Sequence, residues 1–324
     1  MVGQKSLTAT LKNAIQTDRL ASAYLFCGPR GCGKTTCARI FAKTINCENR
    51  TAEGESCGEC ESCKAFAEGR SMNIHELDAA SNNSVDDIRG LIEKVMVPPR
   101  IGTKSVYIID EVHMLSTQAF NAFLKTLEEP PKYAIFILAT TEKHKVLPTI
   151  LSRCQIYDFQ RMTMQDTIDH LMGIAEKEGI SAVPEAMAVI AQKADGGMRD
   201  ALSIFDQVVA CCGNELTYDR VIANLGILAD EYFFKMTSAL SRAEYRNAVV
   251  LLDEVLRTGY DAGNFMSGLS LHIRNVLMAR DSKTVELLDV SQNLKQEYQE
   301  QVYEEEIVEP EPEPEPEPVV EPEP

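Results

Sequence analysis

A glycine-rich loop near the start of the chain constrains the fold more than any other segment. Residues 28–36 read GPRGCGKTT, which matches the pattern G-x-x-x-x-G-K-[ST]. The loop follows a short apolar run, AYLFC at 23–27, and precedes a segment with helical character at 34–46. Glycines let backbone N–H groups turn inward around phosphates, and a helix N-terminus adds partial positive charge. The sequence therefore predicts a strand, a phosphate-binding loop and a helix in succession.

The residues of this loop have separable roles in holding a nucleotide. The Lys34 ammonium can reach the β and γ phosphates, and the Thr35 hydroxyl can ligate Mg²⁺. The predicted nucleotide-binding set is the whole loop: Gly28, Pro29, Arg30, Gly31, Cys32, Gly33, Lys34, Thr35 and Thr36. A glycine-rich turn that arises by chance would not account for the strand and helix on either side.

Two acidic residues follow a second apolar run. SVYIID at 105–110 ends in Asp110, and Glu111 comes next. Asp110 can hold the Mg²⁺ shell, and Glu111 can polarise an attacking water. Taken alone, two acids after a strand are more often a solvated helix start, where the helix dipole favours negative charge. Together with the phosphate loop, they predict a site that hydrolyses ATP or GTP.

Short apolar runs alternate with helical patterns in the first half of the chain. Leu7, Leu11 and Ile15 recur at four-residue spacing, which predicts a first helix. The apolar runs lie at 23–27, 74–77, 105–110, 134–140 and 155–159, with helical stretches at 34–46, 84–96 and 116–128 between them. Near-continuous apolar strands separated by helices are typical of a parallel sheet with helices on both faces. The predicted fold class is therefore α/β.

From about residue 161 the strand pattern stops and only helices are expected. The end of the chain is different again: residues 304–324 hold ten Glu and no cation, interleaved with Pro. Such a segment cannot pack a core. It also supplies more than half of the formal net charge of −17. The rest of the chain is still not the basic surface of a protein that grips nucleic acid over a whole face.

The sequence shows no secretion signal and no membrane span. Met1 leads into an amphipathic segment, and no run of about 18 apolar residues occurs. We therefore expect a cytoplasmic protein without a membrane partner, in which thiols stay reduced.

Four of the ten cysteines lie close together in the segment after the first phosphate-binding helix. Cys47, Cys57, Cys60 and Cys63 offer four thiolates, enough for a closed tetrahedral zinc site. An iron–sulfur cluster is the rival, because C-x2-C-x2-C also occurs in ferredoxins, but the C-x3-C-P continuation is missing. Zinc is favoured, and it would hold in place a polar segment too poor in apolar residues to fold alone.

Three later motifs add polar groups that could act on a nucleotide. ILATT ends a predicted strand with Thr140 and Thr141, LSRC contains Arg153, and GGMRDALS places Arg199 at a helix start. Each has an ordinary structural explanation, as a helix cap or as one half of a surface ion pair. His113 is the only histidine near the acidic pair, and helix packing is its default role.

Taken in order, these motifs resemble a known family. GPRGCGKTT, the cysteine cluster, IIDEVHMLSTQAFNAFLKTLEEPP, LATT, ILSRCQ and GGMRDALS are similar to the gamma/tau subunits of the bacterial DNA polymerase III clamp loader, which are AAA+ ATPases. The resemblance covers about residues 2 to 280. The LKTLEEPP run and the SRC triplet are characteristic of clamp-loader ATPases.

The resemblance implies a role for each matching residue. The implied catalytic set is Lys34, Asp110, Glu111, Thr140, Thr141, Arg153 and Arg199. Glu111 would be the catalytic base, and one of the two threonines would be sensor 1. Arg153 would be an arginine finger donated to ATP in the neighbouring subunit, and Arg199 would be sensor 2. The implied cofactors are ATP, Mg²⁺ and Zn²⁺, and the implied partners are other clamp-loader subunits in a hetero-oligomeric ring, the sliding clamp and primed DNA.

The same resemblance divides the chain into four parts. We expect an AAA+ nucleotide-binding domain over 1–160 with a zinc module at 47–63, a helical lid over 161–228, a partial helical collar over 229–302 and a disordered Glu-Pro tail over 303–324.

The two ends depart from the family pattern. Family members carry a basic segment ahead of the point where this chain starts, and Glu-Pro repeats stand where further collar helices are expected. Two functions therefore remain open. The first is an ATPase subunit that loads the sliding clamp onto primed DNA during replication, within a polymerase assembly but without a polymerase site of its own. The second is a truncated nucleotide-binding scaffold that does not hydrolyse. The intact Lys34, Glu111, Arg153 and Arg199 favour the first.

Overall fold

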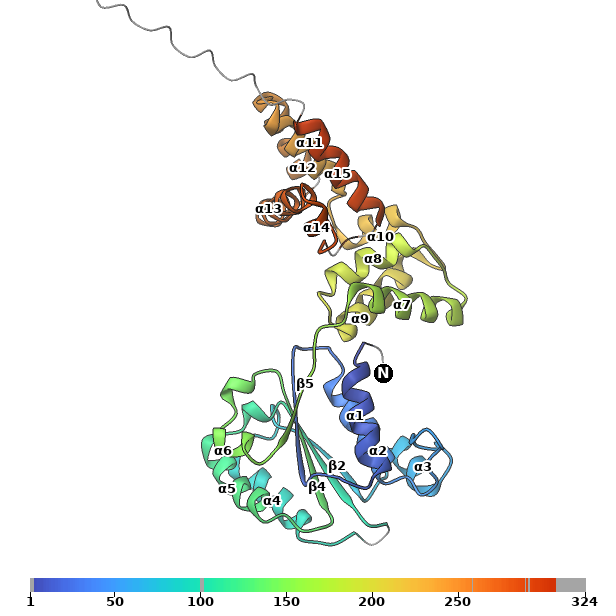
Figure 1. The fold of residues 1–324 in the computed structure, drawn as a ribbon, viewed down its shortest axis with the longest axis vertical. Helices are drawn as coiled ribbons and strands as arrows, with labels where there is room; N and C mark the ends of the chain where they lie inside the picture. Colours follow the sequence, from blue (N-terminus) through green and yellow to red (C-terminus); the bar gives the residue numbers. More distant parts are fainter. Residues whose placement is uncertain (1–2, 100–101, 258, 289, 291, 307–324) are drawn as a thin grey trace, which may run out of the picture. The chain divides into compact units, whose positions relative to one another are not determined.

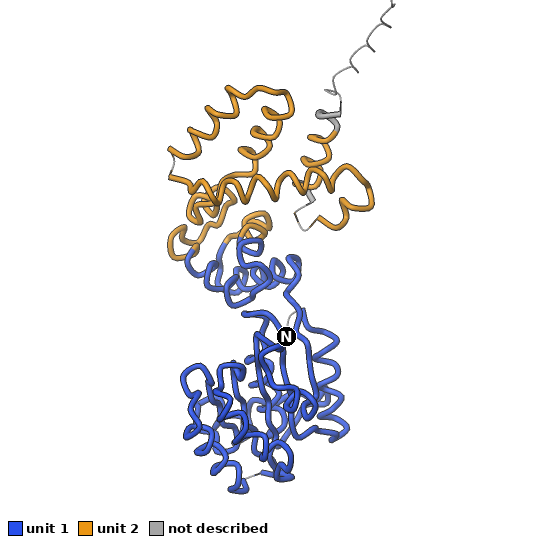
Figure 2. Tube along the Cα trace, turned by 90° about the vertical axis from the view of Figure 1, so that its left-hand side faces the viewer, with its two compact units in different colours: residues 1–180, 190–207 blue, residues 181–189, 208–324 orange. Residues whose placement is uncertain are grey.

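The computed structural model describes residues 3–99, 102–257, 259–288, 290 and 292–306. The chain falls into two compact units (Figure 2): residues 1–180 and 190–207 form unit 1, and residues 181–189 and 208–324 form unit 2. Most of the Glu-Pro tail, from residue 307 on, lies outside the described residues. The division into four parts therefore stays a prediction.

The centre of unit 1 is a five-stranded parallel sheet. Its strands are β1 (Ala23–Cys27), β2 (Ile74–Asp78), β3 (Ser105–Asp110), β4 (Ala134–Thr140) and β5 (Gln155–Asp158), in the spatial order β2-β3-β4-β1-β5 (Figure 1). The inner strands β1, β3 and β4 are buried almost throughout, which is why they read as continuous apolar runs. All five predicted strands are confirmed. Because the strands are parallel, the segments that follow β1, β3 and β4 leave the sheet at the same edge.

Helices cover both faces of the sheet, as predicted. α1 (Lys5–Gln16) and α2 (Lys34–Ile45) pack on one face, and α4 (Val85–Val95), α5 (Thr117–Glu128) and α6 (Pro148–Leu151) pack on the other (Figure 1). Alternate residues of β1 supply the two cores: Tyr24 and Phe26 face α1 and α2, whereas Leu25 faces α4 and α5. Burial of each such side chain contributes about 1.5–3 kcal/mol. In α1, Leu11 and Ile15 are buried as their spacing predicts.

Two helices on the second face begin at serine caps. The Ser84 hydroxyl accepts a hydrogen bond from the Asp87 N–H at 3.2 Å, and the Asp87 carboxylate accepts one from the Ser84 N–H, which is a complete capping box for α4. The Ser116 hydroxyl accepts from the Ala119 N–H in the same way and starts α5. These caps fix where both helices begin.

The polar insert between α2 and β2 contains one short helix, α3 (Glu61–Ala67). Arg50 donates hydrogen bonds to the carbonyls of the last two residues of α2, at 3.0 and 2.8 Å. Lys12 of α1 forms an ion pair with Glu55 at 2.6 Å. The insert is therefore tied to both helices on this face, and Arg50 adds donors at a helix end, where the Thr44 carbonyl also accepts from the Cys47 N–H.

The segment after the sheet is mostly helical. It contains α7 (Met164–Glu178), α8 (Pro184–Lys193), α9 (Met198–Cys212) and α10 (Tyr218–Leu225). One expectation is wrong here, because β6 (Ser181–Ala182) and β7 (Glu215–Leu216) pair as a short parallel ribbon. Two residues per strand are too few to produce a strand periodicity in the sequence.

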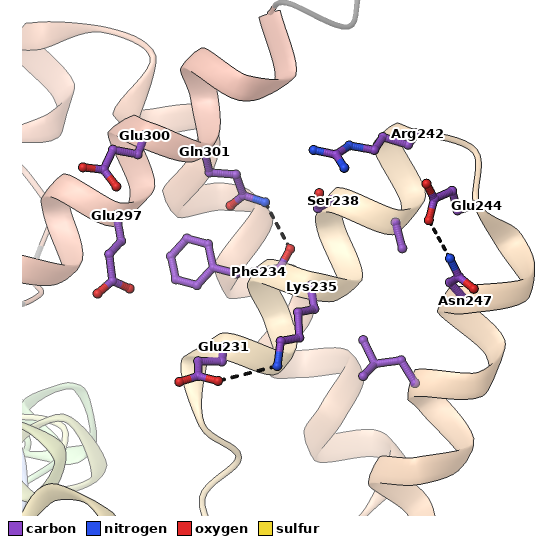
Figure 3. A pocket seen from close by; sticks show the side chains of 12 residues that line it. Glu231, Phe234, Lys235, Ser238, Arg242, Glu244, Asn247, Glu297, Glu300 and Gln301 are labelled. Atoms are coloured by element: carbon purple, nitrogen blue, oxygen red, sulfur yellow. Dashed lines mark hydrogen bonds and ion pairs between the residues drawn. The ribbon is translucent and has the colours of Figure 1, made fainter.

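The rest of unit 2 is a group of helices. These are α11 (Asp230–Ser241), α12 (Tyr245–Arg257), α13 (Ala262–Ala279), α14 (Ser282–Val285) and α15 (Gln292–Glu306). Phe233 and Phe265 belong to one hydrophobic core of this group, and Val276 and Tyr298 belong to another. A pocket of about 640 Å³ opens between α11, α12 and α15 (Figure 3). Its walls carry charges of both signs.

One buried polar group stands out in unit 2. His272 of α13 is 2% exposed and packs against the rings of Phe234 and Tyr298, with ring centroids 4.6 and 5.1 Å away. Its Nε2 lies 3.2 Å from Oε1 of Gln301. Burial lowers the pKa of His272 to about 4.

Candidate nucleotide-binding site

The phosphate loop connects β1 to α2 and requires glycine at several positions. Gly28, Gly31 and Gly33 have φ angles of 149°, 75° and 92°, which other residues rarely adopt. A Cβ at Gly28 would lie 2.4 Å from the carbonyl oxygen of Phe159, so the close approach to the end of β5 also excludes a side chain. α2 starts with no side-chain cap and no acidic residue in its first turn. Its N-terminus is therefore suited to an anion such as a phosphate.

Lys34 is held against this loop. Its Nζ donates hydrogen bonds to the carbonyl oxygens of Gly28 and Pro29, at 2.9 and 2.7 Å, and the residue is 6% exposed. A buried ammonium needs hydrogen-bond partners of this kind to offset the loss of water. The Lys34 ammonium is therefore held at the loop, among the residues predicted to contact phosphates.

Thr35 and Asp110 meet although β1 and β3 are separated by β4. The Thr35 hydroxyl donates to Oδ2 of Asp110 at 2.6 Å. The other carboxylate oxygen of Asp110 accepts from the Glu111 N–H at 2.9 Å. A hydroxyl and a carboxylate at this separation are the oxygen donors that Mg²⁺ prefers, so these two side chains fit the predicted magnesium site.

Glu111 has an unusual backbone conformation. Its φ is 47°, in the left-handed region, directly after β3 and before the short helical turn η1 (Val112–Met114). Such a conformation costs energy for a residue other than glycine and is found most often at functional sites. Oε2 of Glu111 accepts hydrogen bonds from the N–H and the hydroxyl of Thr141, at 3.3 and 3.1 Å. The structure therefore brings the predicted base to the end of β4.

The two neighbouring threonines have different surroundings. Thr141 contacts Glu111 directly, whereas Thr140 is fully buried and its hydroxyl lies 3.0 Å from Nδ1 of His113. The Thr140 hydroxyl also accepts from the N–H of Glu142. Of the two candidates for sensor 1, Thr141 is the one that touches the acidic pair.

His113 is a site residue that the sequence did not reveal. Helix packing was its expected role, but its ring lies on η1 beside the Glu111 carboxylate, with Nδ1 3.4 Å from Oε2. Its Nε2 lies 3.4 Å from the Glu142 carboxylate. The chain turns sharply after Glu111, which directs the histidine toward the end of β4, so the ring has polar neighbours in addition to its packing contacts. A histidine two residues after the acidic pair was the available signal.

Arg199 reaches the phosphate loop through the backbone. The Arg199 N–H faces the Gly31 carbonyl oxygen at 3.4 Å, and a Cβ at Gly31 would lie 3.2 Å from Cα of Gly197. The start of α9 therefore lies against the loop within unit 1. The expected contact between the Arg199 side chain and a bound nucleotide stays a prediction.

Arg153 follows α6 and has partners of its own. One guanidinium nitrogen, Nη2, pairs with Glu128 at 2.7 Å, and another donates to the Thr149 carbonyl oxygen at 2.6 Å. Its side chain is 34% exposed. An exposed arginine with a partner on α5 can still be presented to a second molecule.

The four cysteines of the insert form one cluster. Their sulfur atoms all lie within 4.8 Å of one another, with Cys47 Sγ 3.6 Å from Cys57 Sγ and 4.0 Å from Cys60 Sγ. A tetrahedron of sulfurs around zinc has S–S separations of about 3.8 Å, because Zn–S bonds are about 2.3 Å. Backbone N–H groups, first that of Cys60, lower the pKa of the Cys57 thiol and favour the thiolate. Cys47, Cys57, Cys60 and Cys63 can therefore bind a metal ion.

Among the described residues, no helix is both long and apolar enough to span a bilayer.

The strand order, the loop after β1 and the acidic pair after β3 define the AAA+ class of phosphate-loop proteins. Solved structures with this arrangement include the RuvB Holliday junction branch migration motor of Thermotoga maritima. That structure is 19% identical, with a TM-score of 0.52 over 74% of this chain and 76% of its own. A mutant of the same motor has a TM-score of 0.51. At this identity the likeness concerns the fold alone.

Sequence comparison identifies the family. The family model of the DNA polymerase III delta subunit matches residues 3–163, and that of the clamp loader subunit ATPase lid domain matches residues 167–214. The tau subunit of Bacillus subtilis DNA polymerase III is 43% identical over 286 residues, 88% of this chain and 51% of that protein. The tau subunit of Escherichia coli is 39% identical over 81% of this chain and 40% of its own length. The chain belongs to the gamma/tau family of DNA polymerase III clamp-loader subunits. It spans about half the length of these relatives or less.

Proposed function

We propose that this chain is an ATPase subunit of the replicative clamp loader, and that it uses ATP binding and hydrolysis to load the sliding clamp onto primed DNA. The observation that carries the proposal is the continuous set of contacts Thr35–Asp110–Glu111–Thr141, which joins the first turn of α2 to the ends of β3 and β4. In this proposal, Thr35 and Asp110 are the magnesium-binding pair and Glu111 is the carboxylate base.

Each residue has one task in this proposal. The loop and Lys34 bind the phosphates, and Thr35 and Asp110 hold Mg²⁺, which neutralises phosphate charge when bound. Glu111 accepts a proton from the attacking water. Thr141 senses the γ-phosphate through its contact with Glu111.

Arg153 completes the site of a neighbouring subunit. Its exposure favours action on a second molecule. An arginine supplied in trans is worth about 10³–10⁵ in rate for phosphoryl transfer. Hydrolysis is then coupled to the arrangement of the subunits, because a site without its neighbour's arginine is slow.

The partners follow from this role. We propose that the chain assembles with other clamp-loader subunits, that the ring binds the sliding clamp and primed DNA, and that it does so in the cytoplasm without a membrane partner. Similarity to the tau subunits supports these assignments.

We further propose that the cysteine cluster binds Zn²⁺. Four thiolates and no open position favour a structural site over a catalytic one. Metal analysis of the purified chain should give one zinc per chain and no iron–sulfur absorbance.

The test of the ATPase proposal is a mixing experiment with the full chain and primed DNA. The wild-type ATPase rate per chain should rise with protein concentration, and Arg153→Ala should lower it at least about 100-fold. Glu111→Gln should also be inactive. A mixture of the two inactive variants should regain activity, because the first variant keeps its base and the second supplies the arginine.

Arg220→Ala is the matched control, since Arg220 is an exposed arginine paired with Glu215 in unit 2. Its activity should equal that of the wild type. A mixture that stays inactive would show that Arg153 does not act in trans. A wild-type rate that stays at background despite bound ATP would favour the non-hydrolysing scaffold.

A further inference from the structure

His113 lies where three polar groups of the site meet. The ring belongs to η1, two residues after Glu111, and its side chain is 6% exposed. Nδ1 lies 3.0 Å from the Thr140 hydroxyl and 3.4 Å from Oε2 of Glu111. Nε2 lies 3.4 Å from Oε1 of Glu142. Both ring nitrogens therefore have polar neighbours, which a histidine that only fills space does not need.

The neighbours define which nitrogen carries the proton. A carboxylate can only accept, and Nδ1 faces both the Glu111 carboxylate and the Thr140 hydroxyl, so Nδ1 must carry a proton for the ring to hold Glu111. The Nδ1–H group then donates toward Oε2 of Glu111 and the Thr140 hydroxyl oxygen. Glu142 is held in turn by Lys145, whose Nζ lies 2.8 Å from its other oxygen. A chain of contacts thus runs from Lys145 through Glu142 and His113 to the end of β4.

The same series of contacts reaches the Glu111 carboxylate. Among the residues that the structure describes, the side-chain contacts of Glu111 fall on Oε2: two from Thr141 and one from His113. Oε1 is therefore the oxygen left to accept a proton from water. His113 closes the side of Oε2 that Thr141 does not cover, so it restricts the rotation of the carboxylate about its last bond.

We propose that His113 is a positioning residue that bridges Glu142, Thr140 and Glu111 and fixes the orientation of the Glu111 carboxylate for hydrolysis. The proposal rests on the role of Glu111 as the base. His113 does not contact the phosphate loop in this role. It acts on the chemical step through Glu111, and it should leave nucleotide binding unchanged.

Kinetics of the full chain test this bridge. His113→Ala should lower kcat about 10- to 100-fold, the range expected when a catalytic group loses its orientation. KM and the Kd for mant-ATP should stay within about twofold. His113→Asn should restore part of kcat, because its amide lies near the position of Nδ1. His113→Gln, whose amide lies near Nε2, should not.

His144→Ala is the matched control, because this second histidine also neighbours Glu142, at 3.5 Å, but its side chain is 76% exposed. Its kcat should equal that of the wild type. A wild-type kcat for His113→Ala, or equal rescue by Asn and Gln, would overturn the proposal.

A measurement on the ring separates this proposal from the ATPase proposal. ¹⁵N NMR of the wild-type histidines should show a proton on Nδ1 of His113, and Thr140→Val should shift its Nδ1 signal. A ring protonated at Nε2 alone would overturn the bridge even if the enzyme is active. If the chain binds ATP but does not hydrolyse it, the ATPase proposal fails while the ¹⁵N signals still decide whether the bridge exists.

Discussion

Glu111 combines a left-handed backbone with a carboxylate held by Thr141. Asparagine and aspartate adopt that backbone region more readily, so a glutamate in it is uncommon. The strain is balanced by local contacts, including the hydrogen bond from the Glu111 N–H to Asp110. The residue is therefore placed by its neighbours, and its charge can be removed without changing its shape.

Glu111→Gln tests this placement. The amide keeps the shape and loses the proton acceptor, so ATP hydrolysis should fall about 10²- to 10⁴-fold, the usual value of a general base. Binding of mant-ATP and the melting temperature should stay at wild-type values. Lys34→Ala should show the opposite pattern, with binding lost. A Glu111→Gln variant that hydrolyses ATP at the wild-type rate would assign the base elsewhere.

The sequence was sufficient to predict Lys34, Thr35, Asp110 and Glu111, because fixed spacing relative to a strand end places such groups. It could not separate Thr140 from Thr141. The two are adjacent at the end of β4, where the alternation of a strand ends and a local turn decides which hydroxyl faces Glu111. His113 escaped prediction for the same reason, since a turn of three residues has no periodicity to read.

At the scale of elements, the cysteine insert and α2 depend on each other. Arg50 lies between Cys47 and Cys57 in the sequence and holds the C-terminal carbonyls of α2, the helix whose other end begins at the phosphate loop. The four sulfurs fix the segment that carries Arg50. The spacing of the four cysteines predicted the cluster itself. Its attachment to α2 depends on the rotamer of the long Arg50 side chain, which a sequence pattern does not reveal.

Removal of the metal should therefore destabilise more than the insert. A zinc chelator, or Cys57→Ser, should lower the melting temperature of the full chain and weaken mant-ATP binding. Arg50→Ala should cause part of this loss, about 1–3 kcal/mol, with zinc still bound, because the Ile45 carbonyl loses its Arg50 donor and the Thr44 carbonyl keeps only a backbone donor. Arg70→Ala is the control, since Arg70 only pairs with Glu68 on the surface. If chelation leaves both quantities unchanged, the insert does not support α2.

At the scale of the whole molecule, the candidate nucleotide site lies in unit 1, and the buried His272 lies in unit 2. Unit 1 includes residues 190–207, so Arg199 belongs to the same unit as the phosphate loop although the chain leaves that unit at 181–189. The change from strands to helices was predictable from the loss of apolar runs near residue 161. The grouping of the helices was not, because it depends on which helix faces match in three dimensions.

His272 gives unit 2 its own response to acid. Its pKa is about 4 in the folded chain and near 6.5 when unfolded, so the unfolded state takes up a proton first. The stability of unit 2 should therefore be complete above pH 6.5 and fall as the pH drops toward 4, by up to about 3 kcal/mol. Burial raises the pKa of Asp230, which acts in the opposite direction.

Calorimetry of wild type and His272→Gln between pH 7 and 4 isolates this effect, because Asp230 is common to both. The variant should show a flatter dependence on pH in one transition. ATP and Mg²⁺ should raise the other transition, which belongs to unit 1. A single transition that responds to nucleotide and to the variant alike would show that the two units unfold together.

The position of β1 between β4 and β5 has a consequence for how the protein folds during synthesis. Leu25 is paired with Leu138 on one side and with Ile156 on the other, so the first strand to be synthesised receives both of its neighbours only late. Pairings between distant parts of a chain form slowly. On the ribosome, β2 and β3 can pair while β1, which precedes the phosphate loop, still lacks both of its partner strands. A nascent chain should acquire its affinity for nucleotide only when β5 has emerged, and that affinity would report that the sheet is complete.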